Sequence, residues 1–217
     1  MQIPQAAIER EICKRSFYDF FVRAWHVLEP NRDLISNWHL EYLCSVAEEE
    51  VRRIAHGRQK DHDYLVNMPF RAAKSMIFSV MLQPWAWIEY PHLRFTTVSY
   101  SAELAVAHSN KSVKLMKSDW YQERFGHAFN MKSDVGGQSK LKETERYFEN
   151  DQGGYRFVSS ITGGSTGYGG DINIADDILK AQESDSEARR KEANKFWGET
   201  YPSRVSDFDS SAFFLIM

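Results

Sequence analysis

Short apolar runs alternate with longer segments of helical periodicity along most of this 217-residue chain. This alternation constrains the fold most, because strands separated by helices in one sheet need crossover connections, which is the arrangement of a parallel sheet. The runs with strand character are residues 63–68, 94–99, 155–161, 172–175 and 212–217. The sequence therefore predicts an α/β fold with a mainly parallel sheet flanked by helices.

The helical segments fall into two groups along the chain. Residues 5–28 mix apolar and charged side chains at helical spacing and predict one or two amphipathic helices. The further helices are expected at residues 38–55, 75–89, 101–118 and 184–197. We therefore expect an N-terminal helical segment, residues 1–60, packed on a core formed by residues 61–217.

Composition limits the class of protein. A chain that is 42% hydrophobic at this length can bury one good-sized core. It has no apolar run of the roughly 18 residues that a membrane span needs, and no secretory signal pattern. Cys13 and Cys44 form neither a CxxC pair nor a zinc set with the scattered histidines, so we expect a reducing, cytoplasmic setting.

The net charge of −3 argues against a protein coated with positive charge for nucleic-acid binding. It leaves room for a local basic patch, or for a ring of subunits that gathers lysines around a channel. Lys111, Lys114 and Lys117 recur every three residues along one predicted helix and are candidates for DNA phosphate contacts. A solvated helix face is the favoured interpretation of the same pattern.

Residues 66–75, with the sequence VNMPFRAAKS, connect a predicted strand to a predicted helix. This is the context of a P-loop, in which backbone N–H groups at a helix N-terminus cradle phosphates. Lys74 would reach the outer phosphates and the Ser75 hydroxyl would ligate Mg²⁺. Both standard glycines are missing, since Met68 and Ala73 occupy their positions, and a bare Lys-Ser at a helix start is also a common structural accident.

An acidic pair lies about 100 residues further along, where residues 169–177 read GGDINIADD. A short apolar strand ending in two carboxylates is the Walker B arrangement. Asp176 would then hold the metal ion and Asp177 would orient or deprotonate the attacking water. The alternative is a strand end capped by Asp before a helix, which is frequent.

The loop PFRAAKS, residues 69–75, resembles the Pro-Pro-Arg-x-Gly-Lys-Ser loop of the large terminase subunits of tailed bacteriophages. Phe70 departs from the second Pro and Ala73 from the Gly. The resemblance implies that Arg71 senses or stabilises the γ-phosphate. It also implies nucleotide contacts by the loop residues Pro69, Phe70, Arg71, Ala72, Ala73, Lys74 and Ser75.

Other segments match the same family in the same order. Asn37-Trp38-His39 resembles the stretch that begins the adenine-proximal helix, which makes Trp38 and His39 candidate nucleotide contacts; an ordinary core aromatic and a satisfied helix-start histidine are the alternatives. Residues 98–101 resemble the Ser-Tyr-Ser segment after the second strand, and residues 214–217 resemble the strand of the coupling motif. The resemblance covers residues 17–217.

The family resemblance implies a P-loop NTPase fold of the ASCE, RecA-like type. Its implied activity is Mg²⁺-dependent ATP hydrolysis that drives double-stranded DNA into a procapsid. The implied partners are DNA, the portal protein and the small terminase subunit, with a ring homo-oligomer on the procapsid and a monomer in isolation. The implied location is the bacterial host cytoplasm, at the procapsid portal, with no membrane involved. An arginine from a neighbouring subunit is expected in such a ring; Arg146, Arg156 and Arg204 are candidates, with Arg156 preferred.

Two other functions fit parts of the sequence. A helicase-like DNA translocase would use the same motifs but is expected to carry a second RecA-like domain. A degenerate nucleotide-binding assembly module with little hydrolysis fits the missing glycines and the Asp in place of Glu at residue 177. Because the chain stops within the apolar run 212–217, we expect a fragment cut before a C-terminal nuclease domain, the alternative being a docked edge strand. Nuclease activity is not expected in this fragment.

Overall fold

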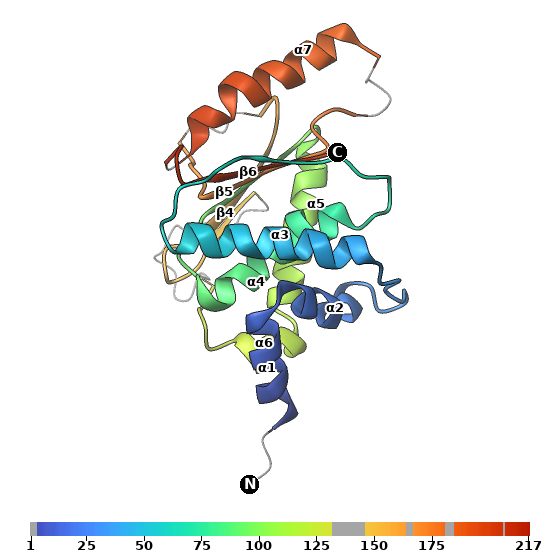
Figure 1. Cartoon of the computed structure of the whole chain (residues 1–217), viewed down its shortest axis with the longest axis vertical. Coiled ribbons are helices and arrows are strands. Elements are labelled where there is room, and N and C mark those ends of the chain that lie inside the picture. The colour runs from blue at the N-terminus through green and yellow to red at the C-terminus, as the bar shows by residue number, and fades with distance from the viewer. Residues whose placement is uncertain (1–3, 132–145, 164–166, 181–184, 206) are drawn as a thin grey trace, which may run out of the picture.

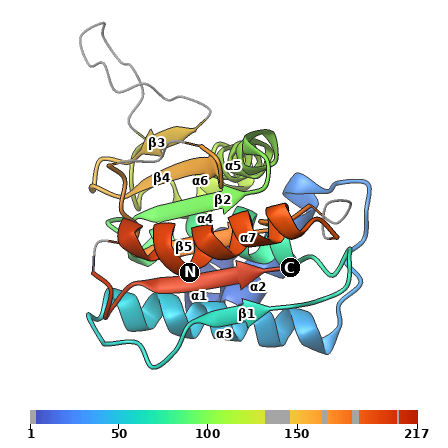
Figure 2. The same cartoon turned by 90° about the horizontal axis from the view of Figure 1, so that it is seen from above.

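The computed structural model describes residues 4–131, 146–163, 167–180, 185–205 and 207–217. Within these residues a six-stranded sheet has the order β1-β6-β5-β2-β4-β3 (Figure 2). Its strands are β1 (Tyr64–Val66), β2 (Phe95–Ser99), β3 (Tyr147–Glu149), β4 (Tyr155–Ser160), β5 (Ile172–Asp176) and β6 (Ala212–Ile216). All neighbours pair in parallel except β3 and β4. The predicted α/β fold with a mainly parallel, helix-flanked sheet is confirmed.

The helices cover both faces of this sheet. They are α1 (Gln5–Arg15), α2 (Phe17–Leu28), α3 (Trp38–Ala55), α4 (Leu82–Glu89), α5 (Ala102–Met116), α6 (Asp119–Phe125) and α7 (Glu187–Lys195). Two π-helical segments, η1 (Met76–Met81) and η3 (Phe196–Thr200), and a 3₁₀ turn, η4 (Pro202–Arg204), complete the described elements. Helix α7 lies over one face, while α3, α4 and the two N-terminal helices stack beneath the other (Figure 1).

Polar residues at the helix starts explain where several of the helices begin. The side chains of Ser16, Asn37 and Ser101 accept backbone N–H groups at the first turns of α2, α3 and α5. Ser118 does the same for α6, a helix that the sequence analysis did not predict. The predicted helix over residues 101–118 therefore ends where a new, short helix begins.

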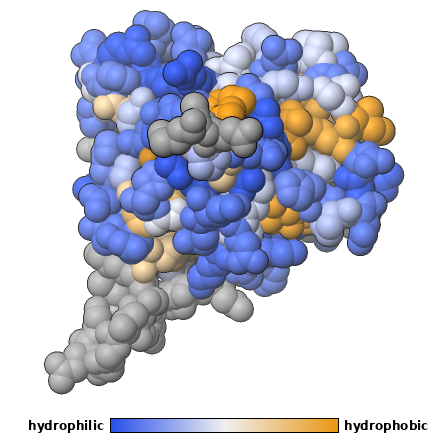
Figure 3. Space-filling view, turned by 90° about the horizontal axis from the view of Figure 1, so that it is seen from below, coloured by the Kyte–Doolittle hydropathy of each residue, from blue (hydrophilic) through white to orange (hydrophobic). Residues whose placement is uncertain are grey.

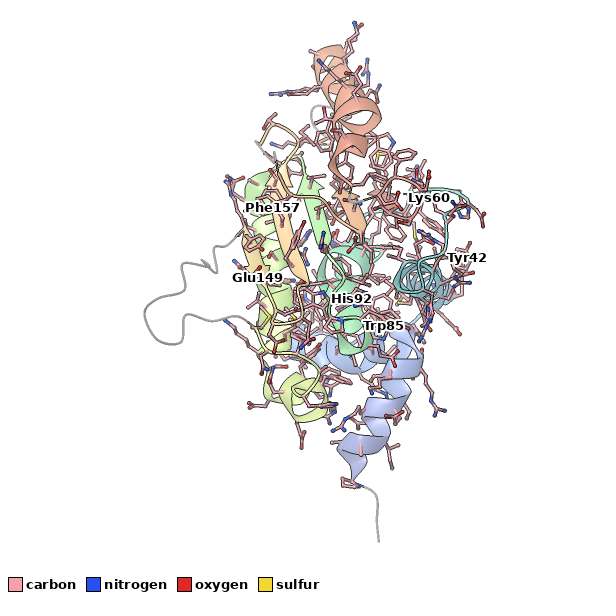
Figure 4. The ribbon with its side chains drawn as sticks, turned by 90° about the vertical axis from the view of Figure 1, so that its left-hand side faces the viewer. Tyr42, Lys60, Trp85, His92, Glu149 and Phe157 are labelled. Atoms are coloured by element: carbon pink, nitrogen blue, oxygen red, sulfur yellow. The ribbon has the colours of Figure 1, made fainter. Side chains whose placement is uncertain are left out.

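The N-terminal helices share one hydrophobic core with the sheet. Trp85 on α4 is buried against the N-terminal helices (Figure 4). Its Nε1 donates to the carbonyl of Cys13 at 2.8 Å, and the centroid of its ring lies 5.0 Å from that of Phe17. A smaller cluster beneath α7 includes Phe196, Tyr201 and Phe213. Helices α1 to α3 thus pack into the same hydrophobic core as the sheet.

The surface seen from below is mostly hydrophilic, with hydrophobic patches set apart from one another (Figure 3). Large apolar side chains with high exposure include Ile35, Trp38 and Phe70. Among the described residues, no helix combines the length and apolar character needed to cross a membrane.

Candidate nucleotide site

The loop after β1 folds around its own lysine. Strand β1 ends at Val66, and helical structure resumes at Lys74. The Lys74 side chain is buried, with 8% of its surface exposed, and its Nζ donates to the carbonyl oxygen of Met68 at 2.9 Å. The ammonium group therefore lies inside the turn of the loop.

Two residues of this loop adopt a left-handed backbone without being glycine. Arg71 has φ 67° and Ala73 has φ 59°. Ala73 occupies the position of the last glycine in the standard P-loop pattern, where the absence of a Cβ removes the strain of positive φ. The loop thus has the backbone that glycine would favour although the sequence pattern lacks the glycine.

The acidic pair lies at the carboxyl end of β5, next to the helix that follows the loop. Ser75 Oγ donates to Asp176 Oδ1 at 3.1 Å, and Ser79 Oγ donates to Oδ2 at 2.6 Å. Asp176 is fully buried. Residues 101 positions apart in sequence therefore meet, in the pairing that the two motifs predict.

Backbone geometry separates the two neighbouring acids. Asp177 has φ 48°, a left-handed conformation that Asp tolerates better than most residues. Its N–H donates to Ile216 O on β6, and its carbonyl accepts from the N–H of Tyr100, the residue after β2. The turn after β5 leaves Asp176 buried against the serines while Asp177 lines a cavity.

Burial dominates the electrostatics of both carboxyl groups. It raises the pKa of Asp176, against the lowering effect of the hydrogen bonds from Ser79 and Ser75 and of the Lys74 charge. Burial also raises the pKa of Asp177, followed by repulsion from Asp176, while Lys74 acts in the opposite direction. A cation bound beside these two acids would favour their ionised forms and so lower both pKa values.

His108 on α5 is a site residue that the sequence analysis missed. Its Nδ1 lies 3.4 Å from Asp176 Oδ2, and burial lowers its pKa to about 4, which leaves the imidazole neutral at neutral pH. The signal was available in the helical spacing. His108 shares a face with the buried residues Ala105, Ser109 and Ser112.

Two cavities use the loop as a wall. The larger, of about 560 Å³, is lined by residues that include Leu34, His39, Arg71, Ala73 and Lys111. The smaller, of about 450 Å³, is lined by Phe70, Ser75, Tyr100, Leu104, His108, Asp177, Leu179 and Lys180. Arg71 and Asp177 therefore face different cavities.

The remaining predicted nucleotide contacts divide between these cavities and the solvent. His39, Arg71, Ala72 and Ala73 line the larger cavity, and Phe70 and Ser75 line the smaller one. Trp38 is not among the lining residues of either cavity, and 74% of its surface is exposed. Pro69 is exposed. Of the adjacent pair at the start of α3, His39 is thus the one placed to contact a ligand.

Arg156 does not lie where an arginine acting across a subunit interface would need to be. It is on β4 with only 1% of its surface exposed, and its guanidinium donates to protein oxygens that include Ser79 O at 2.6 Å and Ser112 Oγ at 3.0 Å. A side chain enclosed in this way cannot reach a nucleotide held by another subunit, so that prediction is corrected. Arg146 is exposed, and the side chain of Arg204 lies outside the described part of the chain.

The predicted lysine row on α5 is also divided. Lys111 is half-buried, lines the larger cavity and forms an ion pair with Glu29 at 2.9 Å. Lys114 and Lys117 are exposed. The three lysines are thus not one uniform basic surface.

The oxygen groups at the end of β5 suit Mg²⁺. This ion is bound by one or two carboxylates together with waters and substrate phosphates, rather than by a full cage of protein ligands. Ser75 Oγ and Asp176 Oδ1 already lie 3.1 Å apart, and Ser75 also lines the smaller cavity with Asp177. Among the described residues, no three His, Cys, Asp or Glu side chains are grouped as a metal site. The candidate Mg²⁺ site has fewer protein ligands than such a group.

No protein-family model matches the chain, and no curated protein matches it in sequence. Two structures of the large terminase from a thermophilic bacteriophage resemble it in fold, with TM-scores of 0.41 and, for the complex with ADP, 0.38. In each case the sequence identity is 11% over 77% of this chain. The match spans 38% of each terminase chain, so this protein corresponds to well under half of their length. These loose likenesses leave the activity to be inferred from the site.

Proposed function

We propose that this chain is a Mg²⁺-dependent ATPase domain. The observation that carries the proposal is the contact between Ser75 and Asp176 at 3.1 Å, beside a lysine that is enclosed by its own loop. A phosphate-binding loop, a metal carboxylate and a second carboxylate at the edge of a cavity are the parts that phosphoryl transfer from ATP needs.

Each residue then has a role that its position permits. Lys74 exchanges the Met68 carbonyl for phosphate oxygens, and Ser75 and Asp176 hold the metal ion. When bound, Mg²⁺ neutralises charge on the β- and γ-phosphates. Asp177 orients the attacking water from the smaller cavity and accepts its proton. The adenosine moiety occupies the larger cavity beside His39, where Arg71 reaches the phosphates from the opposite side of the loop.

We further propose that the ATPase is the motor domain of a viral DNA-packaging terminase. The order and spacing of the motifs support this, from Trp38-His39 through the loop arginine to Asp176-Asp177. Double-stranded DNA, the portal protein and the small terminase subunit would be the partners of an assembled ring at the procapsid in the host cytoplasm. A helicase-like translocase is the competing motor.

The first experiment compares phosphate release by wild type, Lys74→Ala and Asp176→Asn at high protein concentration. We expect both variants to lose at least about a hundredfold in rate, because each removes a charge that acts on the phosphates or the metal ion. Equal rates in all three proteins, with each shown to be folded by its melting profile, would refute ATP hydrolysis. Stimulation of the wild-type rate by double-stranded but not single-stranded DNA would favour the packaging motor over the helicase-like translocase.

Two observations favour a nucleotide-binding module with little hydrolysis as a second candidate. The Cβ of Ala73 is held at positive φ in the loop, and the acid at residue 177 is one methylene shorter than the usual Glu. Binding of Mg·ATP that is lost in Lys74→Ala, without phosphate release above the Lys74→Ala background, would select this candidate.

A further inference from the structure

We propose that Ser79 and Arg156 are positioning residues that fix the Asp176 carboxylate for the metal ion. The inference rests on the proposed function in that Asp176 is the Mg²⁺ ligand. It goes further by assigning a role to two buried side chains that belong to no standard motif. The geometry consists of a direct contact from Ser79 and of a set of contacts from Arg156 that hold Ser79 in place.

Ser75 and Ser79 each donate a hydrogen bond to a different oxygen of the Asp176 carboxylate. Ser75 and Ser79 are four residues apart on the helix that follows the loop, so both face β5. Ser75 donates to Oδ1 and is partly exposed, whereas Ser79 donates to Oδ2 at 2.6 Å and is fully buried. When Ser75 turns to the metal ion, Ser79 keeps the second oxygen in place, and Oδ1 stays directed toward the site.

Arg156 reaches across from β4 to the same helical segment. Its Nη2 donates to the Ser79 carbonyl at 2.6 Å and to Thr97 Oγ1 at 3.2 Å, and its Nη1 donates to Ser112 Oγ at 3.0 Å. The guanidinium therefore joins β4, β2 and α5 to the backbone of the residue whose side chain holds Asp176.

The helix at this point receives hydrogen bonds from other elements. Residues 76–81 are π-helical, and Pro84 lacks an N–H, so the carbonyl of Val80 has no donor four residues later. The Ser112 hydroxyl donates to that carbonyl at 2.7 Å while it accepts from Arg156. Wide helical turns of this kind recur at functional sites. Here the irregular turn is fixed by side chains from two other elements.

The charge of Arg156 also indicates an interaction with Asp176. A fully buried guanidinium is costly unless an acidic group compensates it. Burial lowers the pKa of Arg156 to about 9, and Asp176 is the acidic group that opposes this effect. Ser79 lies between the two, bonded to Arg156 through its carbonyl and to Asp176 through its hydroxyl.

The test measures binding of a fluorescent ATP analogue as Mg²⁺ is titrated, and again in EDTA. Ser79→Ala removes the hydroxyl with little change in volume. Ser211→Ala is the matched control, because Ser211 is equally buried but its hydroxyl donates to Gly170 O, at the start of the parallel strands. We expect Ser79→Ala to raise the half-saturating Mg²⁺ concentration by about 10- to 100-fold. Binding in EDTA should stay unchanged, and Ser211→Ala should match wild type.

Arg156 is tested in the same assay by a charged and an uncharged replacement. Arg156→Met should raise the half-saturating Mg²⁺ concentration at least as much as Ser79→Ala. Arg156→Lys keeps the charge but loses the planar fork, so it should recover part of the Mg²⁺ response. If Arg156→Met does not fold, Arg156→Lys and Ser79→Ala still decide the result.

The outcomes separate the two claims. Wild type that binds the analogue without any Mg²⁺ dependence overturns the proposed metal role of Asp176, and with it the proposed function. A Mg²⁺-dependent wild type with Ser79→Ala equal to Ser211→Ala overturns the positioning role alone. So does a loss of binding by Ser79→Ala that is as large in EDTA as in Mg²⁺, because it would indicate a general structural defect.

Discussion

Replacing Ala73 by glycine tests whether the loop stores backbone strain. Ala73 has φ 59°, and a left-handed backbone costs a residue with a Cβ about 1–2 kcal/mol. Glycine removes this cost, but its freedom in the unfolded chain offsets roughly 0.4–1 kcal/mol of the gain. Loss of a half-buried methyl group removes about 0.4 kcal/mol more, half the value of a buried methylene. The expected net effect is a stabilisation of about 0.4 kcal/mol.

An Ala→Gly substitution inside a helix should have the opposite effect on stability. Ala107 is exposed in the interior of α5, and Ala107→Gly should destabilise by about 1 kcal/mol through helix propensity alone. The two variants should therefore differ by about 1.4 kcal/mol. For a chain of this length that is a difference in Tm of about 3–6 °C, with Ala73→Gly the higher.

The assay is thermal unfolding of the two variants and wild type in one buffer without nucleotide. If Ala73→Gly lowers Tm as much as Ala107→Gly does, the strain argument is refuted. If the strain also limits phosphate binding, Ala73→Gly will bind the ATP analogue more tightly than wild type. Ala107→Gly will bind it with wild-type affinity.

Three further predictions concern the cavity, the buried acid and the thiols. His39→Ala should weaken ATP binding by up to about tenfold, the equivalent of about 1.4 kcal/mol, because His39 lines the larger cavity. The adjacent Trp38→Ala should leave the affinity unchanged. A larger loss of affinity for Trp38→Ala than for His39→Ala in titration calorimetry would contradict the cavity assignment. Because burial raises the pKa of Asp176, its ionisation opposes folding. The stability of the metal-free protein should therefore fall, relative to Asp176→Asn, as the pH rises from below 3.8 through the raised pKa; parallel melting curves for the two proteins would contradict this. Burial also raises the pKa of Cys13 to about 12 and that of Cys44 further, so neither thiol should react with a thiol reagent until the protein unfolds, and rapid labelling of the native protein would contradict the packing.

The alternation of strands and helices was predictable because most of the longer elements show their own period, whereas the short helix α6 was missed. The acid strand was expected over residues 172–175 and is observed as Ile172–Asp176. The order of strands was not predictable, because nothing local in residues 212–217 says that this run inserts between β1 and β5. The π-helical turn from Met76 was not predictable either, and its carbonyl groups accept hydrogen bonds from Arg156 and Ser112, which lie far away in sequence.

The grouping of the candidate site residues was predictable where a sequence motif marks them, and it was missed where only contacts in the fold bring them together. The Lys74, Ser75 and Asp176 positions follow from loop and strand context. Ser79 and His108 have no motif, and they reach Asp176 only through the packing of the helices against β5. Arg156 was misjudged because an arginine near a Gly-rich loop suggests exposure. The strand alternation, in which residue 156 shares its buried face with Val158, indicates the opposite.

The position of β6 has a consequence for the order in which the protein folds during synthesis. Strand β1, which carries the phosphate loop, pairs only with β6 among the described strands, and β6 also separates it from the acid strand β5. The ribosome therefore produces the loop about 140 residues before the segment that attaches it to the sheet. Contacts of such long sequence separation form late and slow folding. Under the proposed function, the loop would therefore become able to bind ATP only after Ala212–Ile216 has been made and has paired with β1.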